Sequence, residues 1–207
     1  MNKKKIIIIG SIAIFIIIIL LSPVIFTEQL FNMAIYSRRK KAGLEKKVID
    51  IDNLKISYLE GGKGKDILLI HGFGADKDNW IYLSKYLTPN YHVVAIDLPG
   101  FGESTKLKKL NYDVISQIKR IDLFVNKIGL KSFIIAGNSM GGHIAVYYTI
   151  NYPNKISSLC LLDSSGVKSL NKKKSNNDDN IFDIKTVKDY DRFYIKNIII
   201  IITFLFI

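Results

Sequence analysis

The residue best suited to chemistry in this chain is a serine held between glycines. The run Gly137-Asn138-Ser139-Met140-Gly141 fits the pattern G-x-S-x-G, in which a sharp turn between a strand and a helix exposes the serine hydroxyl. Glycines on both sides let the backbone pass without Cβ clashes. At average residue frequencies the pattern arises by chance in about one chain in fifteen of this length. The surroundings of Ser139 therefore decide whether it is a candidate nucleophile.

The flanking segments have the character that such a turn requires. Residues 132–136 form a short apolar run that is typical of a buried parallel strand. Residues 143–150 are mostly apolar and are followed by Asn151-Tyr152-Pro153, which is typical of a covered helix that ends before a proline. Strand, turn and helix are thus predicted in the order that a nucleophile needs. The alternative is a glycine-rich turn that holds an ordinary serine.

A second predicted loop has the residues to stabilise a negative oxygen. Residues 67–70 read as a buried strand that runs into His71-Gly72-Phe73-Gly74. Acyl transfer needs two N–H groups facing the oxygen of the tetrahedral intermediate, one from the residue after the nucleophile and one from a loop such as this. The candidates are the backbone N–H groups of Phe73 and Met140. His71 is expected to brace the loop rather than to transfer protons, and a plain glycine turn is the alternative.

The remaining pattern predicts the elements that position these loops. Strands alternate with helices, which predicts an α/β fold with a mostly parallel sheet flanked by helices. The expected elements are a hairpin of residues 48–51 and 56–59 around Asp52-Asn53, a helix over 79–87, a strand over 91–96, a helix from Asn111 to Gly129 and a strand over 156–162. Phe73, Asp97, Ser139 and Asp163 then fall at the carboxyl ends of strands, where such sheets carry their sites. Asp97 is expected to accept backbone N–H bonds rather than to act as a catalytic acid.

The amino terminus predicts a membrane anchor. Residues 6–26 are almost entirely apolar and would extend about 30 Å as a helix, the thickness of a bilayer core. Lysines precede this run, but it is longer than a signal-peptide core and no cleavage site follows. A single-pass anchor over residues 1–30 is therefore expected, in the bacterial inner membrane with the core outside the cytoplasm. The single cysteine, Cys160, is expected to be a small core residue.

The charge of the chain favours a membrane surface as partner. The formal net charge is +12, and three of its basic clusters lie in residues 3–47, close to the apolar segment. Anionic lipid would attract these clusters. Nucleic acid is not expected as a partner, because no basic face on a recognisable nucleic-acid-binding module is present.

Three motifs together resemble the α/β-hydrolase superfamily over residues 48–167. They are the ten residues from His71 to Trp80, the eight residues from Asp97 to Ser104, and Gly137-Asn138-Ser139-Met140-Gly141-Gly142. In combination they resemble membrane-associated bacterial lipases and esterases of the Moraxella and Psychrobacter type. Carbon–carbon bond hydrolases share the Asn-Ser-Met-Gly-Gly turn, whereas dehalogenases have an aspartate where Ser139 stands. The resemblance implies a triad of serine, acid and histidine in that chain order, with no cofactor and no metal.

The sequence departs from this pattern after Asp163. The chain has only His71, His92 and His143, and none lies in a late loop where the family has its base. After Asp163, 44 residues remain (207 minus 163), whereas two further strand–helix units need about 50. We therefore expect a fold that is incomplete at the carboxyl terminus, with the strand that ends at Leu162 left as an unpaired edge.

These inferences predict four segments and a function. The segments are an anchor over 1–30, a basic linker over 31–46, the hydrolase core over 47–167, and a polar loop, partial cap and apolar tail over 168–207. The expected function is hydrolysis of carboxylic esters, such as acylglycerols, with Ser139 as nucleophile and little activity because the triad acid and histidine are missing. The alternatives are a relative of carbon–carbon bond hydrolases and a non-catalytic membrane scaffold.

Overall fold

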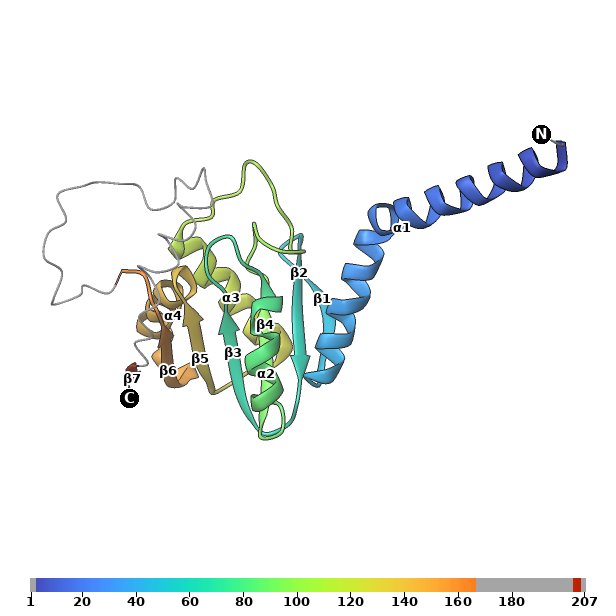
Figure 1. Cartoon of the computed structure of the whole chain (residues 1–207). Coiled ribbons are helices and arrows are strands. Elements are labelled where there is room, and N and C mark those ends of the chain that lie inside the picture. Colours follow the sequence, from blue (N-terminus) through green and yellow to red (C-terminus); the bar gives the residue numbers. More distant parts are fainter. Residues whose placement is uncertain (1–2, 167–202, 206–207) are drawn as a thin grey trace, which may run out of the picture. The chain divides into compact units, whose positions relative to one another are not determined.

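The computed structural model describes residues 3–166 and 203–205 (Figure 1). The chain divides into two compact units, residues 1–41 and 42–207. The first contains one continuous helix, α1 (Lys3–Lys41), whose last turn carries the basic residues Arg38, Arg39, Lys40 and Lys41. Positive charge in the last turn is favourable because the carboxyl end of a helix has a partial negative charge. The basic linker predicted over residues 31–46 is thus helical to Lys41, and the first strand begins at Leu44.

The predicted membrane anchor has no support in the described residues. Across residues 3–166 and 203–205, no helix is both long enough and apolar enough to span a membrane.

The second unit is built on one sheet. Its strands are β1 (Leu44–Ile51), β2 (Leu54–Gly61), β3 (Lys65–Ile70), β4 (Tyr91–Ile96), β5 (Phe133–Asn138), β6 (Ile156–Leu162) and β7 (Thr203–Leu205). They lie in the order β1-β2-β4-β3-β5-β6-β7. The pairs β4/β3, β3/β5 and β5/β6 are parallel, and the strands at both edges pair antiparallel. The predicted mostly parallel centre, formed by strands that alternate with helices, is confirmed.

The hairpin at one edge follows from its turn residues. Asp52 and Asn53 form the two-residue turn between β1 and β2, with φ of 46° and 63°. Positive φ at both positions is what the favoured hairpin turn requires, and Asp and Asn tolerate it better than most residues. The register pairs Ile51 with Leu54, and both side chains are buried. The predicted hairpin is confirmed, and its strands are longer than predicted.

Helices cover both faces of the sheet. Helix α2 (Ile81–Leu87), preceded by the short 3₁₀ helix η1 (Lys77–Trp80), lies in front of the sheet in Figure 1, and α3 (Val114–Ile128) and α4 (Met140–Asn151) lie behind it. A second 3₁₀ helix, η2 (Pro153–Lys155), leads from α4 into β6. Helix α3 begins later than predicted because the Asp113 side chain caps it, accepting a 2.6 Å bond from the Ser116 N–H. It ends where predicted, at Gly129 with φ of 84°.

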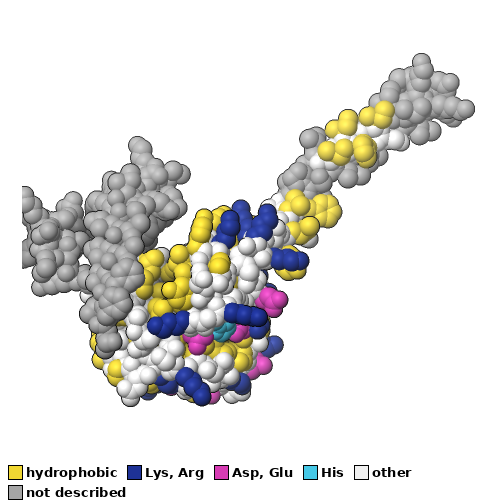
Figure 2. Space-filling model, turned by 90° about the horizontal axis from the view of Figure 1, so that it is seen from below, with side chains coloured by type: hydrophobic (Ala, Val, Ile, Leu, Met, Phe, Trp, Pro, Cys, Tyr) yellow, Lys and Arg dark blue, Asp and Glu magenta, His cyan; other side chains and the backbone are white. Residues whose placement is uncertain are grey.

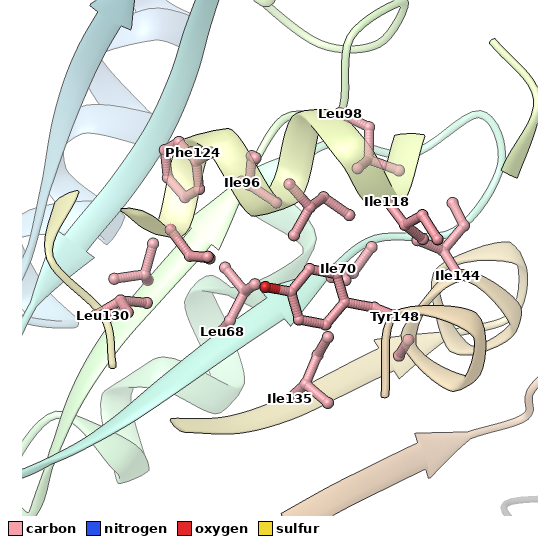
Figure 3. Packing of buried hydrophobic residues seen from close by; sticks show 14 of the residues in the cluster. Leu68, Ile70, Ile96, Leu98, Ile118, Phe124, Leu130, Ile135, Ile144 and Tyr148 are labelled. Carbon is pink, nitrogen blue, oxygen red and sulfur yellow. The ribbon is translucent and has the colours of Figure 1, made fainter. Parts of the chain in front are cut away.

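The main core lies between the sheet and this helix pair. Figure 3 shows Ile118 and Phe124 of α3 and Tyr148 of α4 packed against strand residues such as Leu68 and Ile135. All of these side chains are almost completely buried. The core holds the carboxyl ends of β3 and β5 in place, and these strands carry the two loops of interest.

The strand β6 is not an open edge. Strand β7 pairs antiparallel with it, with Leu159 opposite Leu205 and Leu161 opposite Thr203. The prediction of an unpaired edge at β6 is therefore wrong, because backbone groups of β7 satisfy those of β6. The polar loop and partial cap predicted after residue 167 fall in residues 167–202, outside the described residues.

Candidate active site

Ser139 occupies a strained backbone position. Strand β5 ends at Asn138 and α4 begins at Met140, so Ser139 alone makes the turn between them. Its φ of 51° and ψ of −117° lie in a region that residues with a Cβ rarely adopt. Such strain persists only where surrounding structure enforces it, and it clusters at functional sites. The local geometry is that of a turn that presents a side chain for chemistry.

Backbone hydrogen bonds enforce this turn. The Ser139 N–H donates to the Leu162 carbonyl at 3.0 Å. The Ser139 carbonyl accepts from the N–H groups of Gly142, His143 and Ser165, at 3.0, 3.2 and 3.0 Å. Ser139 is thus tied both to the first turn of α4 and to the segment after β6. The sequence did not indicate the contribution of this last segment.

The glycines allow close contact between the turn and β3. A Cβ on Gly141 would lie 2.2 Å from the carbonyl oxygen of Ile70, and a Cβ on Gly137 would lie 2.2 Å from that of Gly141. Any larger residue would force the start of α4 away from the end of β3. The G-x-S-x-G spacing thus has a steric basis here, as the sequence predicted.

The second predicted loop lies against the serine. A Cβ on Gly72 would be 3.3 Å from Ser139 Cβ and 4.0 Å from Ser139 Oγ. The next residue, Phe73, has a side chain that is 69% exposed and meets the ring of Phe101 edge-on at 5.9 Å. The structure therefore brings the two loops together at the carboxyl edge of the sheet. The roles of the Phe73 and Met140 N–H groups, and of Ser139 as nucleophile, stay predictions.

His71 is a buried brace between two loops. Its Nε2 accepts the Leu98 N–H at 3.1 Å, so Nδ1 carries the proton and donates to the Gly72 carbonyl at 2.8 Å. Burial lowers the pKa of His71, although the bond to Gly72 and the nearby Asp97 oppose this shift. The ring is neutral and both nitrogens are engaged. It braces the loop, as expected.

Asp97 holds together the loop that follows β4. Its buried carboxylate accepts the N–H groups of Lys77 and Glu103, at 2.7 and 2.8 Å, and pairs with Lys77 Nζ at 2.7 Å. A Cβ on Gly102 would lie 2.3 Å from this carboxylate, so the loop can wrap it only with glycine there. The Asp97 carbonyl also accepts from Ser104 Oγ at 2.7 Å. Asp97 receives backbone N–H bonds, as the sequence predicted.

The buried ammonium of Lys77 was missed by sequence reasoning. Its side chain is only 1% exposed, and its Nζ also lies 3.6 Å from Glu103 Oε2. Apart from its position three residues after the Gly72-Phe73-Gly74 turn, nothing in the local pattern distinguishes Lys77 from the other lysines.

None of the three histidines is hydrogen-bonded to Ser139 Oγ within the described residues, which include all three. The ring of His143 packs against that of Tyr147, inclined by 52° and with ring centroids 4.9 Å apart. His92 lies at the amino ends of the parallel strands, where its ring nitrogens meet Asp66 at 2.7 Å and Glu60 at 2.9 Å. Figure 2 shows acidic and basic side chains interspersed on the lower face. Within the described residues, the geometry offers a strained serine without an imidazole partner.

The fold and the strained turn define the class to which this chain belongs. The sequence profile of the alpha/beta hydrolase fold family matches residues 66–199, more than half of the chain. The chain therefore belongs to this family. The matched residues contain both site loops.

Individual relatives are lipases. The chain is 42% identical to Lipase 1 of Psychrobacter immobilis over 132 residues, covering 62% of this chain and 41% of the lipase. It is 33% identical to monoacylglycerol lipase abhd6-A of Xenopus laevis over 163 residues, covering 76% of this chain and 48% of the relative. The predicted resemblance to bacterial lipases of the Moraxella and Psychrobacter type is confirmed. The chain spans about half the length of the curated relatives it matches.

Solved structures agree with these relatives. The crystal structure of a membrane phospholipase A, described as a bacterial virulence factor, superposes with a TM-score of 0.69 at 41% identity. The match covers 83% of this chain and 55% of that chain. The α/β-hydrolase fold predicted from the sequence is confirmed.

Proposed function

We propose that this chain carries the serine-bearing part of a hydrolase of carboxylic esters, with lipid esters such as acylglycerols as substrates. The observation that carries the proposal is the positive φ of Ser139, enforced between β5 and α4 beside the Gly72 loop. The similarity to a monoacylglycerol lipase and to a membrane phospholipase A supports the substrate class.

The proposed chemistry is acyl transfer to Ser139. Its Oγ attacks the ester carbonyl carbon, and the π electrons of the carbonyl move to its oxygen. The N–H groups of Phe73 and Met140 donate to this oxygen, which lowers the barrier by stabilising charge that develops in the transition state. Collapse of the intermediate breaks the bond between the carbonyl carbon and the alcohol oxygen, and the alcohol leaves with the proton that Ser139 gave up. Water then attacks the acyl-enzyme, and its oxygen and one proton leave with the carboxylic acid while its other proton returns to Ser139 Oγ.

The proton of Ser139 needs an acceptor, and the histidines of this chain are held elsewhere. His71 is hydrogen-bonded to Leu98 and Gly72, His92 is hydrogen-bonded to two carboxylates, and the ring of His143 packs at a tilt against Tyr147. A serine without a neighbouring base is a weak nucleophile. We therefore propose slow turnover by this chain, since oxyanion stabilisation and binding alone retain only a small part of the rate.

The same observation favours a second candidate function. A chain with this fold, and with no imidazole bonded to Ser139 in its described residues, suits a non-catalytic binding protein that keeps a hydrolase fold. This candidate predicts a stable, monodisperse protein without turnover of p-nitrophenyl esters.

A fluorophosphonate probe separates the two candidates. We expect slow covalent labelling of this chain at Ser139, located by peptide mass spectrometry, and none in Ser139→Ala. The neighbouring variant Ser164→Ala, which keeps Ser139, is the matched control and should still label. Labelling as fast as that of the Xenopus laevis relative would show that a base is present after all. No labelling of a folded chain would favour the binding protein.

We further propose that α1 contacts lipid. Its exposed side chains include Phe15, Ile16, Phe26 and Phe31, and its last turn is basic. Of the exposed apolar side chains, Phe31 and Met33 lie within about two turns of this basic end, and such a combination suits the boundary between headgroups and acyl chains of an anionic membrane. Flotation with anionic vesicles should carry the full chain upward, and a chain that stays in the dense fraction would refute this contact.

A further inference from the structure

A basic loop rises above the carboxyl ends of the parallel strands. We call residues 105–112, between β4 and α3, the basic loop; it belongs to the yellow-green segment near the top of Figure 1. It contains Lys106, Lys108 and Lys109, all exposed, and no acidic residue. The side chain of Leu107 is 49% exposed and stands among these three lysines. The proposed ester chemistry uses none of these four side chains.

Hydrogen bonds fix the tip of this loop. The Tyr112 hydroxyl accepts the Leu107 N–H at 2.7 Å and donates to the Leu107 carbonyl at 3.0 Å. The same carbonyl accepts the Leu110 N–H at 3.1 Å, and the Leu110 side chain packs against the core. Leu107 thus has its backbone polar groups satisfied within the loop. A segment that enters the membrane interface needs this, because unsatisfied backbone groups are costly away from water.

The base of the loop is tied to the sheet. The Thr105 N–H donates to the Lys55 carbonyl at 2.9 Å, and Thr105 Oγ1 accepts the Lys55 N–H at 2.8 Å. These bonds join the loop to β2. The loop is therefore held at both ends, so its exposed Leu107 does not need to be ordered on binding and little entropy is lost.

We propose that the basic loop docks on an anionic lipid surface, with Leu107 inserted between headgroups and the three lysines beside them. The flanking acids are engaged elsewhere, Glu103 with Lys46 and Asp113 as the cap of α3, so the three lysines leave a net positive charge that matches such a surface. An exposed apolar side chain among lysines is the pattern of interfacial contacts. Phe73, which is 69% exposed after the neighbouring strand, presents a second apolar side chain at this edge. The docking goes beyond ester hydrolysis, and it turns the edge that carries Ser139 toward the lipid.

Fluorescence at position 107 tests the docking without any need for turnover. The full chain with Cys160→Ala and Leu107→Cys is labelled at residue 107 with an environment-sensitive dye and mixed with vesicles. With vesicles of phosphatidylcholine and phosphatidylserine we expect a blue shift that weakens in high salt; with phosphatidylcholine alone we expect none. The emission of the same dye attached to Lys131→Cys, just before the amino end of β5, should not shift. If the emission of the dye at residue 107 stays as it is in water while the chain binds vesicles, the proposal is overturned.

A matched pair of triple variants separates the contribution of the loop to vesicle binding from the general attraction that the net charge of +12 exerts. K106Q/K108Q/K109Q changes the loop, and K63Q/K65Q/K131Q removes equal charge from exposed lysines at the amino ends of the strands. Because each lysine near an anionic leaflet strengthens binding roughly fivefold, we expect the loop variant to bind at least about tenfold more weakly than the control variant. Equal binding by the two variants would contradict the proposal. Retention of the labelled chain on heparin together with an unshifted dye on vesicles would instead point to another polyanion.

Discussion

Ser139 combines backbone strain with the proposed chemistry, and the two can be measured separately. Glycine adopts φ of 51° without a Cβ clash, so Ser139→Gly should be more stable than Ser139→Ala by about 1 kcal/mol. Urea unfolding of both variants gives this difference. Neither variant should react with the fluorophosphonate probe, so both lose the chemistry and only Ser139→Gly relieves the strain. Equal stability of the two variants would show that Ser139 stores no strain.

His71 predicts a pH dependence with a definite sign. Burial lowers its pKa in the folded chain below the ordinary value of 6.5, so the unfolded chain binds more protons near pH 6. The contribution of His71 to stability is therefore complete above about pH 6.5 and is lost as the pH falls below it. The free energy of unfolding, measured in urea from pH 8 to pH 5, should decrease more for the natural chain than for His71→Gln. If the free energies of unfolding of the two chains change with pH in parallel, the pKa of His71 is the same in the folded and the unfolded chain.

At the scale of elements, the Lys77–Asp97 pair joins η1 to the loop after β4. Both side chains are fully buried, so removing one partner leaves an uncompensated charge. Lys77→Met should lower the free energy of unfolding by about 3–5 kcal/mol. The Lys77→Met/Asp97→Asn double variant should lose less than the sum of the single losses, because the charge is then removed with its partner.

Lys46→Met provides the control for this pair. Lys46 and its partner Glu103 are bonded at 2.8 Å but are 43% and 47% exposed. Breaking such a surface pair should cost less than about 1 kcal/mol. If Lys46→Met and Lys77→Met lower the free energy of unfolding in urea by similar amounts, burial does not make the Lys77–Asp97 pair more important than the surface pair.

The sequence predicted most elements because their signals are local. The Asp52-Asn53 turn, the stop at Gly129 and the β5–Ser139–α4 order each depend on residues close together in the chain. What it could not predict depends on distant partners. The pairing of β7 with β6 joins residues more than 40 apart, and Lys77 is buried because Asp97 meets it from the end of another strand. Residue types alone do not record such contacts.

At the scale of the whole molecule, the apolar core lies in one of the two units, whereas the proposed lipid contacts involve both. The large cluster of buried residues in the described chain runs from Ile51 to Leu161, entirely within the second unit. Burial of such apolar surface is the main source of folding free energy. The stability of the sheet should therefore be independent of α1, whereas attachment to vesicles should draw on both α1 and the basic loop.

A chain of residues 42–207 tests this division. It keeps Ala42 and Leu44, which are buried at the start of the sheet unit, and loses all of α1. We expect its free energy of unfolding in urea to stay within about 0.5 kcal/mol of that of the full chain. Changes in parts of a protein that do not interact add up to within about this value. Vesicle flotation should weaken, yet the dye at residue 107 should still shift on anionic vesicles, because the basic loop is intact. A large loss of stability would show that α1 supports the sheet. If the emission of the dye does not shift, the loop cannot dock without α1.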